Sequence, residues 1–339
     1  MSIREAIARA VAREEVPGPV LEAAFGEIMD GQASPAQVAA LLVGLRMKGE
    51  TVAEIVAAAR ALRAVAETVE APDPHTVDTC GTGGTGRSTF SISTTSAFVV
   101  AGAGLPVAKH GNRAVTSASG SFDTLEALGV CIDLPIPRCG EILARIGIAA
   151  FFARTAHPAF RHVGPVRAEI GVRTLLNCLG PLLNPAGARN QLVGVFSDSL
   201  VEPLARALGE LGADRALVVH GSDGLDEITT TGPTHAALCE AGEIKLLELK
   251  PEDFGLPRAR AEDLEGGDAD RNAEILRNVL AGEVGPRRDI VCLNAGAALW
   301  VGRAANSVAE GVEQAAASID SGAAAEKLEA LVQATRAGA

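Results

Sequence analysis

The chain has 339 residues and a formal net charge of −12, with 47% hydrophobic and 21% charged residues. This length allows two domains and a large core. The negative charge disfavours nucleic acid as a partner, because no cluster of Lys and Arg with interleaved aromatic residues offsets it.

The cysteines and the apolar runs indicate the compartment. The six cysteines lie singly and form no C-x-x-C pair, which disfavours structural zinc and favours reduced thiols. The N-terminal stretch lacks the apolar core of a signal peptide. The longest apolar run has about a dozen residues, too few to span a bilayer. We therefore predict a cytoplasmic protein with no membrane partner.

Residues 1–70 carry only helical signals. Ser34 and Thr51 each precede a Gln or Glu by three residues, which predicts two capping boxes. Between them Val38, Leu41, Leu42 and Leu45 recur at helical spacing. The linker 71–74 contains two prolines that keep it out of a helix. The sequence thus predicts a small all-helical N-terminal domain over residues 1–70.

Residues 75–339 alternate between strand-like and helix-like segments. This alternation predicts a larger α/β domain with a mostly parallel central sheet flanked by helices. We expect strands over 191–196 and 215–220 around a helix over 201–211, then a strand pair over 236–240 and 243–249. The expected helices at the end of the chain cover residues 268–280, 289–304, 308–319 and 323–334.

Two polar stretches near the start of the larger domain suggest a single phosphate-rich ligand. The first has four glycines in six residues, Gly81, Gly83, Gly84 and Gly86, followed by several hydroxyl side chains. Glycines let backbone N–H groups close on an anion, and hydroxyls add donors. An apolar helix and strand over 97–107 then lead to Lys109, whose point charge suits phosphate.

Two nucleotide-binding motifs overlap the glycines, and both fit poorly. Gly81, Gly83 and Gly86 satisfy G-x-G-x-x-G, but the acidic residue that a dinucleotide fingerprint needs about 20 positions later is missing. The stretch from Gly81 also nearly matches the nucleoside-triphosphate loop. However, Arg87 stands where that motif needs lysine, and a guanidinium does not replace it freely. A glycine-rich turn without a ligand is the remaining alternative.

A pair of carboxylates follows the strand expected to end at His220. Asp226 and Glu227 come after a Gly-Ser-Asp-Gly loop. Open α/β sheets bind ligands at the carboxyl ends of their strands, and Mg²⁺ prefers carboxylate oxygens. This placement favours a Mg²⁺ site, with plain surface charge as the alternative.

Four long motifs in one order resemble the anthranilate phosphoribosyltransferases of tryptophan biosynthesis. They are GTGG with KHGNRAVTSASGS, then AHPAFRHVGPVRAEIGVRTLLNCLGPLLNPAG, then VVHGSDGLDEIT, and finally GGDADRNAEILRNVLAGE with NAGAALW. The resemblance spans nearly the whole chain. It implies transfer of the phosphoribosyl group of 5-phosphoribosyl 1-diphosphate to the amine of anthranilate, with Mg²⁺ as cofactor. It also implies that part of 157–187 joins the helical domain, and that this domain forms a homodimer contact.

The resemblance also implies roles for individual residues. Asp226, Glu227 and Ser93 would hold the metal, while Arg167, Asn112 and Gly81 would bind anthranilate, the arginine as a two-point partner of the carboxylate. His110 and His157 lie in family-like loops and could line the same site, without an assigned proton-transfer role. The residues expected around the phosphoribosyl diphosphate are Gly81, Gly84, Thr85, Thr89, Ser91, Ser93, Thr94, Lys109, His110, Gly111, Asn112, Arg113, Ser117 and Ser121.

The sequence departs from the family pattern at two positions. Thr85 stands where relatives carry aspartate, which argues against a second Mg²⁺ site of the kind they form. Ser91 replaces an asparagine, which predicts the loss of a hydrogen bond to the sugar phosphate, on the order of 1 kcal/mol.

Two competing functions fit parts of this sequence. One is a pyrimidine nucleoside phosphorylase of the same fold, against which Arg167 and the intact KHGNR loop argue. The other is a non-catalytic paralogue that binds nucleic acid, which the net charge opposes.

Overall fold

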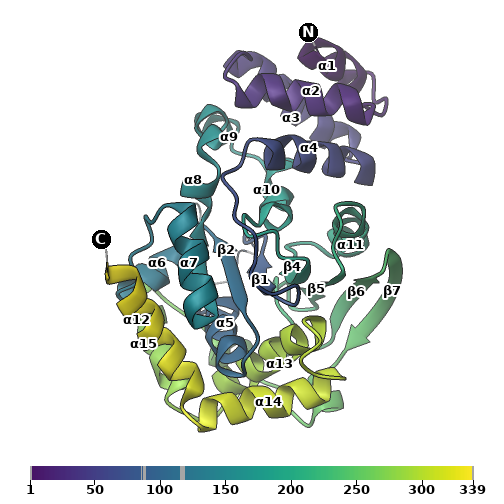
Figure 1. Ribbon diagram of the computed structural model, residues 1–339. Helices are drawn as coiled ribbons and strands as arrows, with labels where there is room; N and C mark the ends of the chain where they lie inside the picture. Colours follow the sequence, from purple (N-terminus) through teal and green to yellow (C-terminus); the bar gives the residue numbers. More distant parts are fainter. Residues whose placement is uncertain (1, 85, 87–88, 115–118, 338–339) are drawn as a thin grey trace.

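The computed structural model describes residues 2–84, 86, 89–114 and 119–337 (Figure 1). Thr85, Arg87, Ser88 and Ser117 therefore lie outside the described residues. Within the described part of the chain, no helix combines the length and apolar character needed to cross a membrane.

The N-terminal helices form as the capping signals predict. They are α1 (Ser2–Val11), α2 (Gly18–Met29), α3 (Pro35–Lys48) and α4 (Val52–Ala64). Ser34 and Thr51 both close capping boxes, with Gln37 and Glu54 as the partners. These boxes satisfy backbone N–H groups that a helix start leaves free. The predicted apolar face of α3 is buried, so the expected helical domain is confirmed.

A seven-stranded sheet forms the centre of the larger domain, in the order β3-β2-β1-β4-β5-β6-β7. The first five strands in this order are parallel to one another, and β6 is antiparallel to both of its neighbours, β5 and β7. This confirms a mostly parallel sheet. The strands are β1 (Val77–Gly81), β2 (Val107–Gly111), β3 (Ile148–Phe152), β4 (Asn190–Gly194), β5 (Arg215–Gly221), β6 (Thr234–Glu240) and β7 (Glu243–Leu249).

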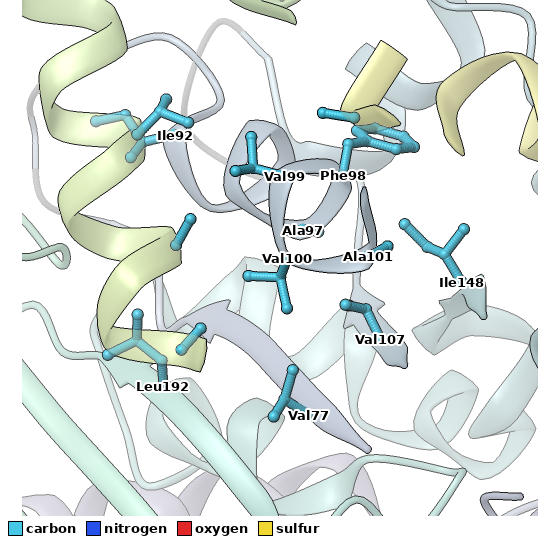
Figure 2. Packing of buried hydrophobic residues seen from close by; sticks show 14 of the residues in the cluster. Val77, Ile92, Ala97, Phe98, Val99, Val100, Ala101, Val107, Ile148 and Leu192 are labelled. Carbon is cyan, nitrogen blue, oxygen red and sulfur yellow. The ribbon is translucent and has the colours of Figure 1, made fainter. Parts of the chain in front are cut away.

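Helices cover both faces of this sheet. On one face α5 (Ile92–Gly102) packs between the sheet and α13 (Pro286–Val301). Figure 2 shows Val100 of α5 near Val77 and Val107 of the strands below it. Helices α7 (Ile136–Ile146), α12 (Ala269–Leu280), α14 (Val308–Asp320) and α15 (Ala323–Arg336) extend this core, and α6 (Ser121–Ala127) lies beside α12. On the other face, α11 (Val201–Glu210) shares a buried cluster with α4.

The expected helix over 289–304 lies three residues earlier than predicted. Pro286 occupies the first turn of α13, after Gly285 with φ 126°, and Gly302 caps its end. Proline suits the first helical turn because its missing N–H has no partner there in any case. Pro286 and Gly302 therefore fix the two ends of the helix.

The chain returns to the helical domain through a short irregular segment. It contains α8 (Ala153–Ala156), α9 (Gly164–Ile170) and α10 (Leu176–Leu179), which lie between the helical domain and the sheet in Figure 1. Val163 and Val166 are buried in the same cluster as Leu41 and Leu45. Both ends of the segment bond to the stretch between α4 and β1, where the Glu67 and Val69 amides donate to the carbonyls of Ala156 and Pro185. The short 3₁₀ turns of the chain cover Pro158–His162, Gly180–Leu183, Asp198–Leu200, Pro251–Phe254 and Ala261–Leu264.

Candidate active site

Four neighbouring parallel strands end in glycine at one edge of the sheet. Gly81 of β1 is in register with Gly194 of β4, while Gly111 ends β2 and Gly221 ends β5. A methyl group on Gly81 or Gly194 would overlap the side chain or the backbone carbonyl of Asp226. Gly81 and Gly194 are therefore glycine because the loop after β5 lies directly against them, whereas a methyl group on Gly111 would meet Ser121 and Phe122.

The predicted carboxylate pair contacts the glycine-rich part of the chain. Asp226 Oδ2 accepts a hydrogen bond of 2.7 Å from the Gly83 amide, and Glu227 Oε1 accepts one of 3.1 Å from the Ser93 amide. Residues 82–84, which follow β1, are called the glycine-rich loop below. Residues 222–233, between β5 and β6, are called the acidic loop. The two loops, 140 residues apart in sequence, meet at this edge.

The electrostatics of this pair suit a divalent cation. Burial, and then the charge of Asp226, raise the pKa of Glu227 to about 8, and burial raises the pKa of Asp226. A cation between two confined carboxylates would relieve both effects. Among the described residues no group of three or more His, Cys, Asp or Glu side chains could hold a metal. A pair of carboxylates is within the number that Mg²⁺ usually takes from a protein, since it completes its shell with water and substrate phosphates.

Buried hydrogen bonds hold the acidic loop in place. The Asp223 carboxylate accepts from the hydroxyls of Thr229 and Thr231 at 2.6 and 2.7 Å. Asn294 of α13 is fully buried and bonds to both the N–H and the C=O of Ile228, each at 2.9 Å. The sequence analysis did not single out Asn294, although an amide in the apolar stretch of a helix is a signal that could have done so.

Lys109 lies beneath this edge rather than at a solvated tip. Its side chain is 3% exposed, and Nζ donates to the Thr79 carbonyl at 2.7 Å. Burial lowers the pKa of Lys109, while the charges of Asp78 and Glu227 raise it. Asp78, which the sequence analysis missed, is buried and accepts from the His110 amide and from Asn184. The available signal was a carboxylate three residues before the first glycine of the glycine-rich stretch.

His110 and His157 meet in the interior, with their ring centroids 5.3 Å apart. Burial lowers the pKa of His110 to about 3 and that of His157 to about 4. Within the described part of the chain, His110 Nε2 and His157 Nδ1 have no hydrogen-bond partner. Both rings are therefore neutral at pH 7, and each keeps one unused polar atom.

The residues after β2 form their own contacts. Arg113 pairs with Glu126 at 2.8 Å and lies 3.5 Å from Asp123. Asn112 Oδ1 accepts from the Arg113 amide, and the Ser121 hydroxyl donates to the Asn112 carbonyl at 3.3 Å. Carboxylates of α6 therefore engage the guanidinium of Arg113 in this structure.

The predicted hydroxyl residues separate into two groups. Ser93 lies against Glu227, and the Thr79 hydroxyl donates to the Ser93 carbonyl. In contrast, the Ser91 hydroxyl is 2.8 Å from that of Thr124 on α6. Thr89 pairs with Glu265 in an isolated bridge, and Thr94 is fully buried. The structure therefore brings Ser93, and not Ser91, to the acidic pair.

Arg167 lies on α9, in the returning segment. Its side chain is partly buried, and burial lowers its pKa. Among the described residues it makes no ion pair, whether with the nearby Glu169 or with another acid. Six residues later Arg173 donates to the carbonyl of Gly84, with its guanidinium carbon 4.3 Å from the centre of the Phe196 ring. Neither Arg173 nor Phe196 was among the predicted site residues.

Comparison with known proteins identifies the family. The family model "Glycosyl transferase family, helical bundle domain" matches residues 4–66, and "Glycosyl transferase family, a/b domain" matches residues 73–325. The anthranilate phosphoribosyltransferase of Rubrobacter xylanophilus is 54% identical over 335 residues, which are 98% of each chain. This chain belongs to the anthranilate phosphoribosyltransferase family. Its activity is therefore phosphoribosyl transfer to anthranilate in tryptophan biosynthesis, as the motifs predict.

Solved structures of other anthranilate phosphoribosyltransferases share the whole fold. The Thermus thermophilus protein is 44% identical with a TM-score of 0.92, covering 98% of this chain and 99% of its own. The Saccharomyces cerevisiae protein in complex with PRPP and Mg is 26% identical with a TM-score of 0.91, covering 99% and 98%. The same yeast protein is also known in complex with 4-fluoroanthranilate, at 25% identity, a TM-score of 0.89 and the same coverage.

Proposed function

We propose that the edge formed by the glycine-rich and acidic loops binds 5-phosphoribosyl 1-diphosphate with Mg²⁺, and that Arg167 and Asn112 bind anthranilate beside it. The single observation that carries this proposal is the pair of contacts from Asp226 to Gly83 and from Glu227 to Ser93. These contacts bring the two acidic side chains to the backbone that would surround the phosphates. Asp226 and Glu227, with Ser93, would hold the ion, which would neutralise charge on the departing pyrophosphate.

The remaining residues of the chain would act by position and charge. Exposed N–H groups of a glycine-rich turn are suitable donors for phosphate oxygens. Lys109, buried beneath the edge, adds positive charge to a region that otherwise carries three acidic groups, Asp78, Asp226 and Glu227. Anthranilate has a neutral amine that can attack the anomeric carbon without a strong base, so holding it in line is the main requirement. The neutral state of His110 and His157 agrees with this.

A fluorescence assay tests the reaction and the two halves of the site. In the wild type, anthranilate fluorescence should fall only when phosphoribosyl diphosphate and Mg²⁺ are both present, and thymidine plus phosphate should not react. Arg167→Ala should raise the KM for anthranilate by roughly tenfold or more, because a charged hydrogen-bonded partner of the carboxylate is lost. The KM for the diphosphate should change little. If both KM values change equally, or neither does, the assignment of Arg167 is wrong.

We further propose that the protein is a cytoplasmic homodimer that associates through the helical domain, and that part of 157–187 belongs to this domain. Val11 at the end of α1 and Met47 near the end of α3 are each 69% exposed, and these helices pack together.

All six cysteines are free thiols, which suits a reducing compartment. Light scattering should give about twice the mass of one chain, and Met47→Glu should shift the measured mass toward that of a single chain. A monomeric wild type would contradict the dimer.

A further inference from the structure

The three described residues that follow β1 are each held by a different part of the molecule. The Thr82 hydroxyl accepts a hydrogen bond of 3.0 Å from the Phe196 amide, just beyond β4. The Gly83 amide donates to Asp226 in the acidic loop, and the Gly84 carbonyl accepts from the guanidinium of Arg173. The first two supports come from loops at the edge of the sheet. The third comes from the segment that returns to the helical domain.

Arg173 is suited to hold this carbonyl in a fixed direction. Its guanidinium lies over the Phe196 ring at 4.3 Å, a cation–π distance that orients the planar group. Although Arg173 is exposed, it makes no ion pair within the described ranges of the chain. Gly83 and Gly84 both have positive φ, at 65° and 74°. Glycine adopts this region readily, and the same freedom leaves the loop dependent on outside contacts for one conformation.

Buried residues anchor the backbone on both sides of Arg173, in contrast to the exposed glycines of the glycine-rich loop. Val166 on α9 and Leu175, two residues after Arg173, are buried in the cluster that contains the core of the helical domain. Arg167, the proposed anthranilate ligand, lies on the same α9. Arg173 therefore links the loop proposed to bind phosphate to the segment proposed to bind the acceptor.

We infer that Arg173 is a positioning residue for the phosphoribosyl diphosphate site. By holding the Gly84 carbonyl from outside, and by stacking on Phe196, it keeps the glycine-rich loop in one conformation against the acidic loop, where the diphosphate would bind. Arg173 itself does not touch the reacting atoms. This inference rests on the proposed function, because it needs the glycine-rich loop to be the phosphate-binding element.

Steady-state kinetics of Arg173→Ala give the first test. We expect the KM for phosphoribosyl diphosphate to rise by about tenfold, with kcat and the KM for anthranilate within about twofold of the wild type. The KM of Arg173→Lys for phosphoribosyl diphosphate should lie between those of the wild type and Arg173→Ala. An ammonium group can still donate to the Gly84 carbonyl, but it lacks the planar surface that stacks on Phe196. Arg161→Ala is the matched control, since Arg161 is an exposed arginine of the same segment. It should match the wild type.

Two further measurements separate positioning from a general loss of structure. Amide hydrogen exchange at Gly83 and Gly84 should be faster in Arg173→Ala, with an unchanged melting temperature, and calorimetry should show weaker binding of magnesium pyrophosphate. Phe196→Leu should act in the same direction, and the double variant should be less impaired than the two single effects combined, because both residues support one carbonyl.

The outcomes distinguish the inference from the function on which it rests. A wild type that transfers no phosphoribosyl group would overturn the proposed function. An active wild type, with Arg173→Ala unchanged in both the KM for the diphosphate and the amide exchange, would overturn only the role of Arg173. Equal increases in both KM values with a lowered melting temperature would show a structural role, and would also overturn it.

Discussion

The two loops that meet at the edge of the sheet are built in opposite ways. The acidic loop is internally bonded through Asp223, Thr229 and Thr231, and Asn294 fixes its backbone from a buried helix. The glycine-rich loop has exposed glycines and is held by hydrogen bonds from three other segments. A rigid element suits a group of charges whose geometry must be exact for a metal, whereas an adaptable backbone suits a large anion that arrives and leaves.

The largest expected effect comes from removing the charges that the rigid loop presents. Asp226→Ala combined with Glu227→Ala should lower kcat/KM for phosphoribosyl diphosphate by about a thousandfold or more, because the site for the ion is lost. The KM for anthranilate should change much less. Steady-state kinetics with each substrate varied in turn measure both effects. The control replaces two exposed acids, Asp270→Ala with Glu329→Ala, and should match the wild type. A double variant with near-normal activity would remove the acidic loop from the mechanism.

A stability measurement tests whether the acidic loop is the rigid one. Asn294→Ala leaves the buried N–H and C=O of Ile228 without partners and should lower the free energy of unfolding by about 3 kcal/mol. Urea denaturation at pH 7.5 gives the value. A loss below about 1 kcal/mol would show that Asn294 does not rigidify the loop.

The pH dependence of stability tests a buried group that lies outside both loops. Residues 82–84 carry no titratable side chain, so the glycine-rich loop adds no pH dependence of its own. The pKa of His157 is lowered to about 4 by burial, from an ordinary value of 6.5. Between these values the unfolded chain binds a proton at His157 and the folded chain does not. The free energy of unfolding therefore falls as the pH falls through this window, by up to about 1.4 kcal/mol per pH unit for this group.

His157→Asn should remove this contribution. Urea denaturation of the wild type and the variant at pH 7.5, 6, 5 and 4.5 isolates it. His157 is neutral in both states at pH 7.5, so the difference there reports only its packing and its hydrogen bond with the Leu183 carbonyl. Parallel pH profiles for the two proteins would contradict a buried neutral His157.

The smallest effect is expected in the glycine-rich loop. Gly84→Ala places a side chain at φ 74°, and its methyl group would lie 3.4 Å from Arg173, an acceptable contact. The strain should therefore lower the free energy of unfolding by only about 1 kcal/mol. Isothermal calorimetry with magnesium pyrophosphate should nevertheless show weaker binding. A stability loss as large as that of Asn294→Ala would mean that the two loops do not differ in rigidity.

The local elements of the fold could be predicted because their signals lie within a few residues of each other. The capping boxes at Ser34 and Thr51 needed only the residue three positions later. The mostly parallel sheet followed from the alternation of segments, although neither β1 nor β3 was among the predicted strands. The residues of β3, Ile148–Phe152, form a short apolar run that periodicity cannot assign to either a strand or a helix.

By itself the sequence determined the helical domain, the α/β class, the family motifs and the acidic pair, because each depends on residue types at short and fixed spacings. Only the tertiary structure placed Asp226 against Gly83, buried Lys109 beneath the edge, turned Ser91 toward α6 and brought Arg173 to Gly84. These contacts join residues tens to more than a hundred positions apart. They arise because parallel strands deliver their following loops to one edge, and the spacing of residues along the chain carries no record of which loops will meet there.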